Sequence, residues 1–348
     1  MKLLNVLSSL SLFIAFCMGS PGDNLDEFID CTYACEYQRN CYGSEVNYID
    51  PETNAFSKVQ FFDTPVVYAD FLLWDCIADC DYQCQQIITK MRIREDKEIY
   101  QFHGKWPFLR LFGTQELYSV LFSIGNFIPH YQGFHRLKAK FVSPKSSPFN
   151  NILINYTYVA IAGMAAWTAS SIFHLRDLIV TEKLDYFFAG LTVLSAFHAL
   201  FARMTRLYLY KTLSTIFTGS VVFIFVIHLL RLYIDWSYTY NMRFNVFFGI
   251  LQYGLLMFLS YQNYQSLKDH KNIYHYRTKL IKLCVIPVVL VVVTAMAMSL
   301  ELFDFFSYQF QIDAHALWHA ATIIPSHYLY EFLIEDFDYI AEAKQSRD

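Results

Sequence analysis

Three histidines have the spacing and the position of a metal site. His315 and His319 occur in the run His315-Ala-Leu-Trp-His319, so on a helix both imidazoles lie on one side. The glutamate of the HExxH motif is missing, so this is not the zincin pair. His174 ends an earlier apolar stretch. A third imidazole from another helix would leave one coordination position open, which is typical of catalytic zinc.

A hydroxyl and a carboxylate accompany these histidines. Ser170 precedes His174 by one helical turn, and Asp185 lies at the start of the next apolar stretch. A hydroxyl and a carboxylate near a zinc-activated water are what ester or amide hydrolysis needs. Each residue also has a plainer interpretation. The histidines can hydrogen-bond to neighbouring helices, Ser170 can serve helix packing, and Asp185 suits a helix N-terminus.

The elements that must position these residues are apolar helices. Of 348 residues, 55% are hydrophobic and 17% are charged, whereas an ordinary soluble domain has about 25% charged residues. This composition excludes a disordered chain, and a net charge of -4 argues against a nucleic-acid binder. Blocks long and apolar enough to cross a membrane lie at 114–131, 152–173, 184–202, 213–231, 243–261, 279–300 and 314–334.

The distribution of lysine and arginine predicts the orientation of these seven blocks. The first, third and fifth loops between them hold twelve such residues, and the other loops hold four. Because cytosolic loops carry the excess of positive charge, the N-terminal segment is expected in the lumen and the C-terminus in the cytosol. By this topology His174, His315 and His319 lie at the luminal face.

The N-terminus is typical of a secretory signal peptide. Lys2 is followed by an apolar stretch from Leu3 to Met18 and by small residues, which predicts cleavage after Gly19. The alternative is a first membrane helix, for which this stretch is short against about 20 residues. The predicted organisation is a signal peptide (1–19), a luminal cysteine-rich domain (20–110), a seven-helix transmembrane hydrolase domain (111–335) and a cytosolic tail (336–348).

Six of the eight cysteines fall in the predicted luminal domain, where oxidising conditions favour disulfides. They are Cys31, Cys35, Cys41, Cys76, Cys80 and Cys84. Two antiparallel helices facing each other would give the nested pairs Cys31–Cys84, Cys35–Cys80 and Cys41–Cys76, which is one of fifteen connectivities. A structural zinc site is the competing interpretation, although CxxC spacing is absent. The predicted fold class is therefore all-α, a polytopic seven-helix bundle with a small disulfide-stapled N-terminal domain.

The run Ser170-Ser171-Ile172-Phe173-His174, with Asp185 and the His315–His319 pair, resembles the CREST superfamily of seven-helix membrane hydrolases, which includes alkaline ceramidases and adiponectin receptors. Within it, the chain is most similar to the Per1-like, post-GPI-attachment-to-proteins family, and to its fungal members above all. The segments that carry this resemblance are SPGD (20–23), CTYAC (31–35), WDCIADCDYQC (74–84), FHGKWPF (102–108), LDYFFAGLTVLSAFHA (184–199), DWSYTYNMRFN (235–245) and SLELFDFF (299–306).

The resemblance implies a lipase of the endoplasmic reticulum membrane that remodels GPI anchors. Such a protein removes the sn-2 fatty acid of GPI-anchored proteins in a phospholipase A2-like reaction. By the same resemblance, His174, His315 and His319 bind Zn²⁺, and Ser170 and Asp185 assist catalysis. An acidic residue and an asparagine of the first helix also match the superfamily. They are Glu116 and Asn126, which we expect to be structural or to support the metal ligands.

Two other functions stay open from the sequence. A ceramidase-like amidase would use the same metal chemistry on a sphingolipid, and only its products would distinguish it. A non-catalytic seven-helix receptor or transport factor would bind no zinc or would bind it without turnover. No pair of helices interrupted by glycine or proline favours a transporter. The oligomeric state is not determined by these patterns.

Overall fold

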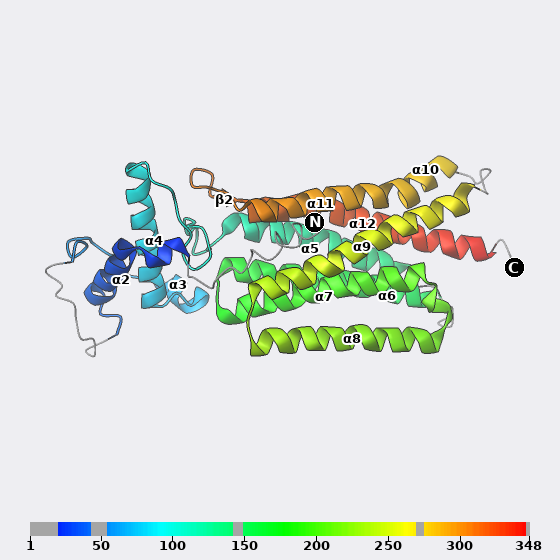
Figure 1. Cartoon of the computed structure of the whole chain (residues 1–348), viewed down its shortest axis with the longest axis horizontal. Coiled ribbons are helices and arrows are strands. Elements are labelled where there is room, and N and C mark those ends of the chain that lie inside the picture. The colour runs from blue at the N-terminus through cyan, green and yellow to red at the C-terminus, as the bar shows by residue number, and fades with distance from the viewer. Residues whose placement is uncertain (1–19, 43–53, 142–148, 269–274, 346–348) are drawn as a thin grey trace, which may run out of the picture. The chain divides into compact units, whose positions relative to one another are not determined.

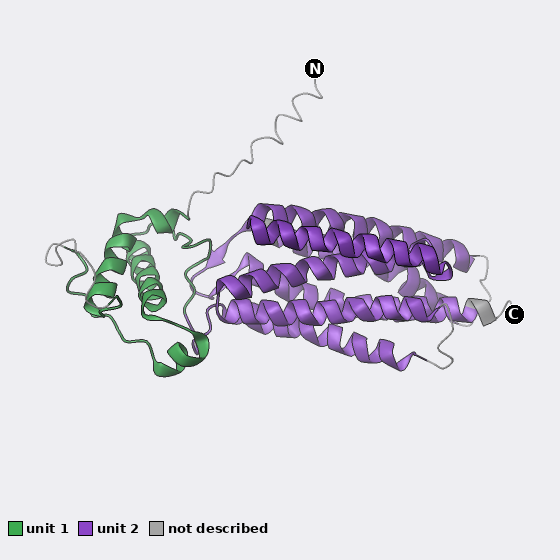
Figure 2. Ribbon diagram, turned by 90° about the horizontal axis from the view of Figure 1, so that it is seen from below, with its two compact units in different colours: residues 1–109 green, residues 110–348 purple. Residues whose placement is uncertain are grey.

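The computed structural model describes residues 20–42, 54–141, 149–268 and 275–345. The predicted signal peptide at 1–19 lies outside these residues, as do Lys145 and Lys271 of the predicted cytosolic loops. The chain divides into two compact units, Met1–Leu109 (unit 1) and Arg110–Asp348 (unit 2), which Figure 2 shows in green and purple.

Unit 1 is a small helical unit closed by disulfides. Its elements are the 3-10 helix η1 (Pro21–Asn24) and the helices α2 (Asp26–Gln38), α3 (Val66–Leu72) and α4 (Cys76–Arg94). Helix α2 packs against α4. The disulfides are Cys31–Cys84, Cys35–Cys80 and Cys41–Cys76, so the nested pairing predicted from the spacing is confirmed. With their sulfurs paired, these cysteines do not form a zinc site.

The apolar core of unit 1 is small and surrounds the disulfides. The large buried side chains of this core are Phe28, Phe56, Ile88 and Phe102. Gly22 lets η1 pack closely against this core, because a Cβ there would lie 2.5 Å from the carbonyl oxygen of Gln101 and 2.7 Å from the Phe102 ring. A small domain with so little apolar burial depends on covalent closure for its stability.

Unit 2 is a bundle of long helices that run lengthwise in Figure 1. Its helices are α5 (Leu117–Ala139), α6 (Asn150–Leu175), α7 (Ile179–Met204), η3 (Leu207–Leu209), α8 (Lys211–Ile234), α9 (Tyr238–Lys268), α10 (Tyr276–Leu280), the π-helix η4 (Ile281–Val285), α11 (Ile286–Phe303) and α12 (Ala314–Gln345). A short antiparallel pair, β1 (Phe306–Ser307) and β2 (Ile312–Asp313), precedes α12. The described residues are thus all-α apart from this pair and two isolated β-bridges.

Each of the seven predicted apolar blocks corresponds to one long helical segment of unit 2, with α10, η4 and α11 forming a single segment. Within the described residues, five segments are long and apolar enough to cross a membrane: Asn150–Leu175, Ile179–Met204, Lys211–Ile234, Tyr238–Lys268 and Tyr276–Leu300. Helices α5 and α12 are less apolar because they carry buried polar residues such as Asn126, His319 and Asp336. That these two helices also span the membrane stays a prediction.

The boundary predicted between the bundle and a tail at residue 336 falls inside α12, which continues to Gln345. Asp336 is fully buried. The reason is an ion pair, since the carboxylate of Asp336 accepts hydrogen bonds from the Arg203 guanidinium at 2.7 and 2.9 Å. Tyr156 and Asn263 donate to the same carboxylate at 3.0 and 3.1 Å. This network, the Asp336 cluster, joins α6, α7, α9 and α12.

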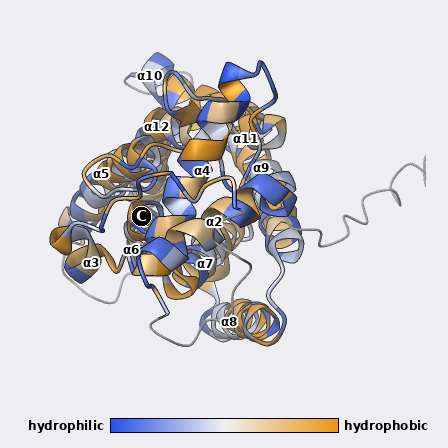
Figure 3. Ribbon diagram, turned by 90° about the vertical axis from the view of Figure 1, so that its left-hand side faces the viewer, coloured by the Kyte–Doolittle hydropathy of each residue, from blue (hydrophilic) through white to orange (hydrophobic). Residues whose placement is uncertain are grey.

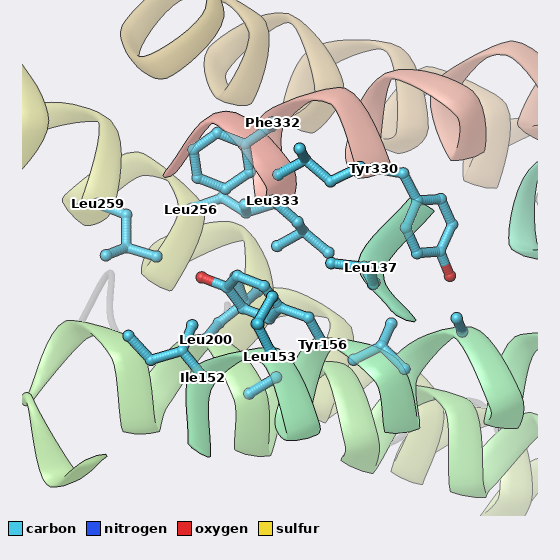
Figure 4. Packing of buried hydrophobic residues seen from close by; sticks show 14 of the residues in the cluster. Leu137, Ile152, Leu153, Tyr156, Leu200, Leu256, Leu259, Tyr330, Phe332 and Leu333 are labelled. Atoms are coloured by element: carbon cyan, nitrogen blue, oxygen red, sulfur yellow. The ribbon is translucent and has the colours of Figure 1, made fainter. Parts of the chain in front are cut away.

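Apolar packing holds the same helices together around this cluster. Figure 4 shows the main side chains of this apolar core, to which α5 also contributes Leu137. The others are Ile152, Leu153, Tyr156, Leu200, Leu256, Leu259, Tyr330, Phe332 and Leu333. Helix α8 differs, because most of its residues are exposed although its sequence is strongly apolar (Figure 3). An apolar surface of this kind on a bundle helix is what a lipid environment stabilises.

Candidate metal centre

The three predicted histidines converge in unit 2. His174 lies in the last turn of α6, and His315 and His319 lie in the first two turns of α12. Each offers one ring nitrogen, and the three nitrogens lie within 4.8 Å of one another. The Nε2 atoms of His174 and His315 are 3.3 Å apart. His174 and His319 are buried, whereas His315 is half-buried.

Local structure explains why α12 presents its histidines at its very start. The carboxylate of Asp313, at the end of β2, accepts a hydrogen bond from the backbone N–H of Ala316 at 2.8 Å. This contact satisfies one of the free N–H groups in the first turn and fixes where the helix begins. The helical period then places His315 and His319 on one side.

Glu116 fixes the orientation and the tautomer of His174. Its carboxylate Oε2 lies 2.7 Å from Nδ1 of His174, and both side chains are buried. The backbone N–H of Glu116 also donates to the carbonyl oxygen of His174 at 3.0 Å. Because a carboxylate accepts, the proton of a neutral His174 sits on Nδ1, which leaves the Nε2 lone pair for a metal. A carboxylate behind a histidine is the usual support of a zinc ligand.

Two serines and an asparagine hold His319. Nδ1 of His319 lies 2.9 Å from Oγ of Ser123, which in turn lies 3.1 Å from Oγ of Ser170. The side-chain amide of Asn126 donates to the backbone carbonyl of His319 at 2.7 Å. With Nδ1 engaged, Nε2 of His319 is the nitrogen available to a metal. Glu116 and Asn126 therefore both contact predicted ligand residues.

Two tryptophans contact the histidine rings. The Trp167 ring meets the His319 ring edge-on at 5.1 Å between centroids, and Trp318 lies 5.3 Å from His315. The indole N–H of Trp167 donates to Nε2 of His130 at 3.2 Å. His130 fits there only because Gly163 faces it without a side chain. The proton of His130 is then on Nδ1, which donates to the Tyr330 hydroxyl oxygen at 2.6 Å.

The structure brings together most, but not all, of the predicted residues. Ser170 is buried and reaches His319 through Ser123. Asp185 lies in the second turn of α7, half-buried, and is not part of the three-nitrogen group. It shares that end of the bundle, since the ring of the next residue, Tyr186, contacts Phe173 beside His174 at 6.5 Å. Its role stays a prediction.

Sequence reasoning missed Ser123, Trp167 and His130. No spacing within α5 marks Ser123 or His130, because each acts across a helix interface. One signal was present for Trp167, which falls at the same helical face as Ser170 and His174.

The donor set fits zinc. Three neutral imidazoles with a free position match catalytic zinc sites, and soft or carboxylate-rich sets that favour other metals are not found in this group. Two of the three histidines carry a hydrogen-bond partner on the nitrogen that faces away from the group. Burying such a polar cluster inside an apolar bundle costs free energy, and polar clusters of this kind usually mark functional sites.

The fold and this site define an all-α protein of the membrane type with a candidate metal centre at one end of its bundle. The sequence profile of the Per1-like family matches residues 66–337, so the chain belongs to the Per1-like family. It is 62% identical over 339 residues to Protein PER1 of Saccharomyces cerevisiae, covering 94% of each chain.

More distant relatives match over nearly the full length as well. The Schizosaccharomyces pombe Protein PER1 homolog is 34% identical, covering 96% of this chain and 92% of its own. The human GPI-specific phospholipase A2-like PGAP3 is 30% identical, covering 96% and 94%. No solved structure matches the chain.

Proposed function

We propose that the protein is a membrane-embedded, zinc-dependent acyl hydrolase that remodels GPI anchors. Its substrate is the lipid of GPI-anchored proteins, and its products are a free fatty acid and a lyso-GPI. The observation that carries the proposal is the convergence of His174, His315 and His319 within 4.8 Å. The name of the PGAP3 relatives, GPI-specific phospholipase A2-like, supports this class of substrate and reaction.

Zn²⁺ bound by three histidines supplies Lewis-acid chemistry, which polarises an ester carbonyl and acidifies water to a pKa of about 7. Asp185 takes the proton of the attacking water. Ser170 donates a hydrogen bond to the oxygen of the ester carbonyl as its negative charge develops. Asp185 then returns the proton to the departing glycerol oxygen, so that hydrolysis is balanced. Glu116 and Ser123 keep the imidazoles in place throughout.

The predicted topology agrees with this substrate. The charge asymmetry of the loops places the histidine end of the bundle at the luminal face, with unit 1 luminal and the C-terminus cytosolic. GPI lipids carry their glycan and protein on that side. We assign the protein to the endoplasmic reticulum membrane, with a signal peptide at 1–19, a luminal domain at 20–110 and the hydrolase domain from 111 on.

The decisive experiment is mass spectrometry of the GPI lipid in cells that lack this protein. Wild type should restore the remodelled lipid, whereas His315→Ala, made at equal abundance, should leave the original sn-2 chain. The matched control is His327→Ala, since His327 is exposed on the same helix and is not part of the metal group. Full rescue by His315→Ala contradicts the metal-dependent reaction. Restored sphingolipid turnover without a change in the GPI lipid would identify a ceramidase-like amidase instead.

A further inference from the structure

A second polar and aromatic group lies at the histidine end of the bundle. It consists of Lys183 and Tyr186 on the first turns of α7, and of Tyr233 and Trp236 where α8 ends before α9. We call these four residues the rim cluster. The first two residues lie on α7 and the other two near the α8–α9 junction, so no local pattern in the sequence connects them.

The rim cluster is built from close ring contacts. The rings of Tyr186 and Trp236 are stacked, with centroids 5.0 Å apart and an angle of 17° between planes. The ammonium nitrogen of Lys183 lies 5.7 Å from the ring centroid of Trp236 and 5.8 Å from that of Tyr233. Tyr233 is 73% exposed, so this aromatic surface is open to a ligand.

The charge of Lys183 has no counter-ion among the described residues. A neighbouring cation shows the contrast, because Arg231 pairs with Asp235 at 2.7 Å. Lys183 instead keeps its ammonium beside two aromatic rings, where the cation–π attraction holds it without neutralising it. A cation in this setting is prepared for an anion, since lysine is a common point-charge partner of phosphate.

The rim cluster is connected to the candidate metal centre. The ring of Phe173 lies 6.5 Å from that of Tyr186 and 5.1 Å from that of His174. Asp185 sits between Lys183 and Tyr186 in the sequence of α7. A continuous path of ring contacts therefore leads from His174 through Phe173, Tyr186 and Trp236 to the ammonium of Lys183.

We propose that the rim cluster binds the phosphoinositol headgroup of the substrate lipid, an inference that rests on the proposed GPI hydrolase function. In a glycerophospholipid, only the glycerol backbone separates the sn-2 ester from the phosphate. With that ester at the three histidines, the phosphate meets the ammonium of Lys183. The inositol ring then lies on the aromatic surface of Trp236 and Tyr233, whose amphipathic rings accept a partly polar ligand.

The general alternative is that these residues only anchor the bundle in the membrane interface. Tyrosine and tryptophan gather there, and lysine side chains extend to water from nearby positions. An extended lysine would avoid the rings, whereas Lys183 lies against two of them. The stacked pair also joins α7 to the α8–α9 junction instead of pointing outward from one helix.

The test is native mass spectrometry of the purified full-length protein with equal amounts of phosphatidylinositol, phosphatidylserine and phosphatidylcholine. Wild type should retain phosphatidylinositol in preference to both others. Lys183→Gln should reduce that retention about tenfold, the loss expected for one charge-assisted hydrogen bond. Trp236→Leu should reduce it by a similar factor. The matched control is Arg243→Gln, which removes an exposed cation from the first turns of α9 and should change nothing.

Three results overturn the proposal. They are no preference for phosphatidylinositol in wild type, equal retention of phosphatidylserine, and equal losses in Lys183→Gln and Arg243→Gln. The binding readout separates this inference from the hydrolase function. Lys183-dependent binding without GPI hydrolysis would support the headgroup site and contradict the proposed hydrolase function. Hydrolysis that needs His315 but not Lys183 would support the hydrolase function and contradict the headgroup site.

Discussion

Two buried polar clusters lie on α12, and they differ in how completely their groups are paired. His315 and His319 lie at its start, and Asp336 lies about 25 Å beyond His319 by the helical rise. In the Asp336 cluster, the carboxylate has an arginine, a tyrosine and an asparagine as partners. In the histidine group, the outward nitrogens of His174 and His319 are paired and the inward ones converge.

This difference separates a structural from a functional use of buried polarity. A buried ion pair whose hydrogen bonds are complete can hold helices in a fixed relation but has no capacity left for a ligand. An imidazole that is hydrogen-bonded through one nitrogen can still bind a metal through the other. The predictions below test this contrast, from the largest effect to the smallest.

The largest effect is expected from Asp336→Ala. It leaves the buried charge of Arg203 without its carboxylate, which should lower the free energy of unfolding by about 3–5 kcal/mol. Thermal unfolding of the purified protein, followed by tryptophan fluorescence, measures the loss. The zinc content of the folded fraction should not change. In the double variant Arg203→Met/Asp336→Leu, which removes both charges, most of the stability should return. A loss of zinc at unchanged stability would show that the two clusters are not separate.

Glu116→Gln should act on the other cluster. The amide keeps the shape of the side chain but removes the charge behind His174, so zinc affinity should fall about 10- to 100-fold. Competition with a chelator, titrated on the purified protein, gives this affinity. Thermal stability without zinc should stay close to wild type. The control is Glu331→Gln, which removes a carboxylate that pairs with Arg136 at the other end of the bundle. Equal affinities in wild type and Glu116→Gln argue against the support role.

Ser123→Ala should have a smaller effect of the same kind. It removes the hydroxyl between His319 and Ser170, and the loss of one neutral hydrogen bond, about 1 kcal/mol, corresponds to about fivefold weaker zinc binding. Ser119→Ala is a matched control one turn earlier on α5, because its buried hydroxyl has no partner among the described residues. If both variants bind zinc equally well, Ser123 does not orient His319.

The smallest effect concerns Glu36, a buried carboxyl group of unit 1 that makes no ion pair with the described residues. Burial raises the pKa of Glu36, and the nearby charge of Asp81 adds to this effect, although the Tyr42 hydroxyl opposes it. A raised pKa means that the folded state holds the proton more tightly than the unfolded state. Stability should therefore fall as the pH rises above the unfolded pKa of about 4.5, and stay lower at neutral pH. Glu36→Gln should remove this fall, as unfolding curves at pH 4 and pH 7 would show. An unchanged pH dependence contradicts the assignment.

Much of the fold follows from local patterns. The seven apolar blocks each became one helical segment, and the four-residue spacing of Cys31–Cys35 and Cys76–Cys80–Cys84 gave the three disulfides. The helices extend beyond the apolar blocks, because polar residues such as those beyond 334 in α12 can also be buried when a partner is present. The boundary predicted at residue 336 falls inside α12 for this reason, since Arg203, Tyr156 and Asn263, all far away in the sequence, make a buried Asp336 favourable.

The same distinction applies to the candidate site. By itself, the sequence determined that His315 and His319 share a helix face, because helical period is a local property. It also predicts the type of metal that three histidines favour. Only the tertiary structure decided that Ser123 supports His319, that Trp167 lies against it, and that Lys183 meets Trp236. These contacts join residues of different helices, and packing between helices, not spacing along the chain, brings such residues together.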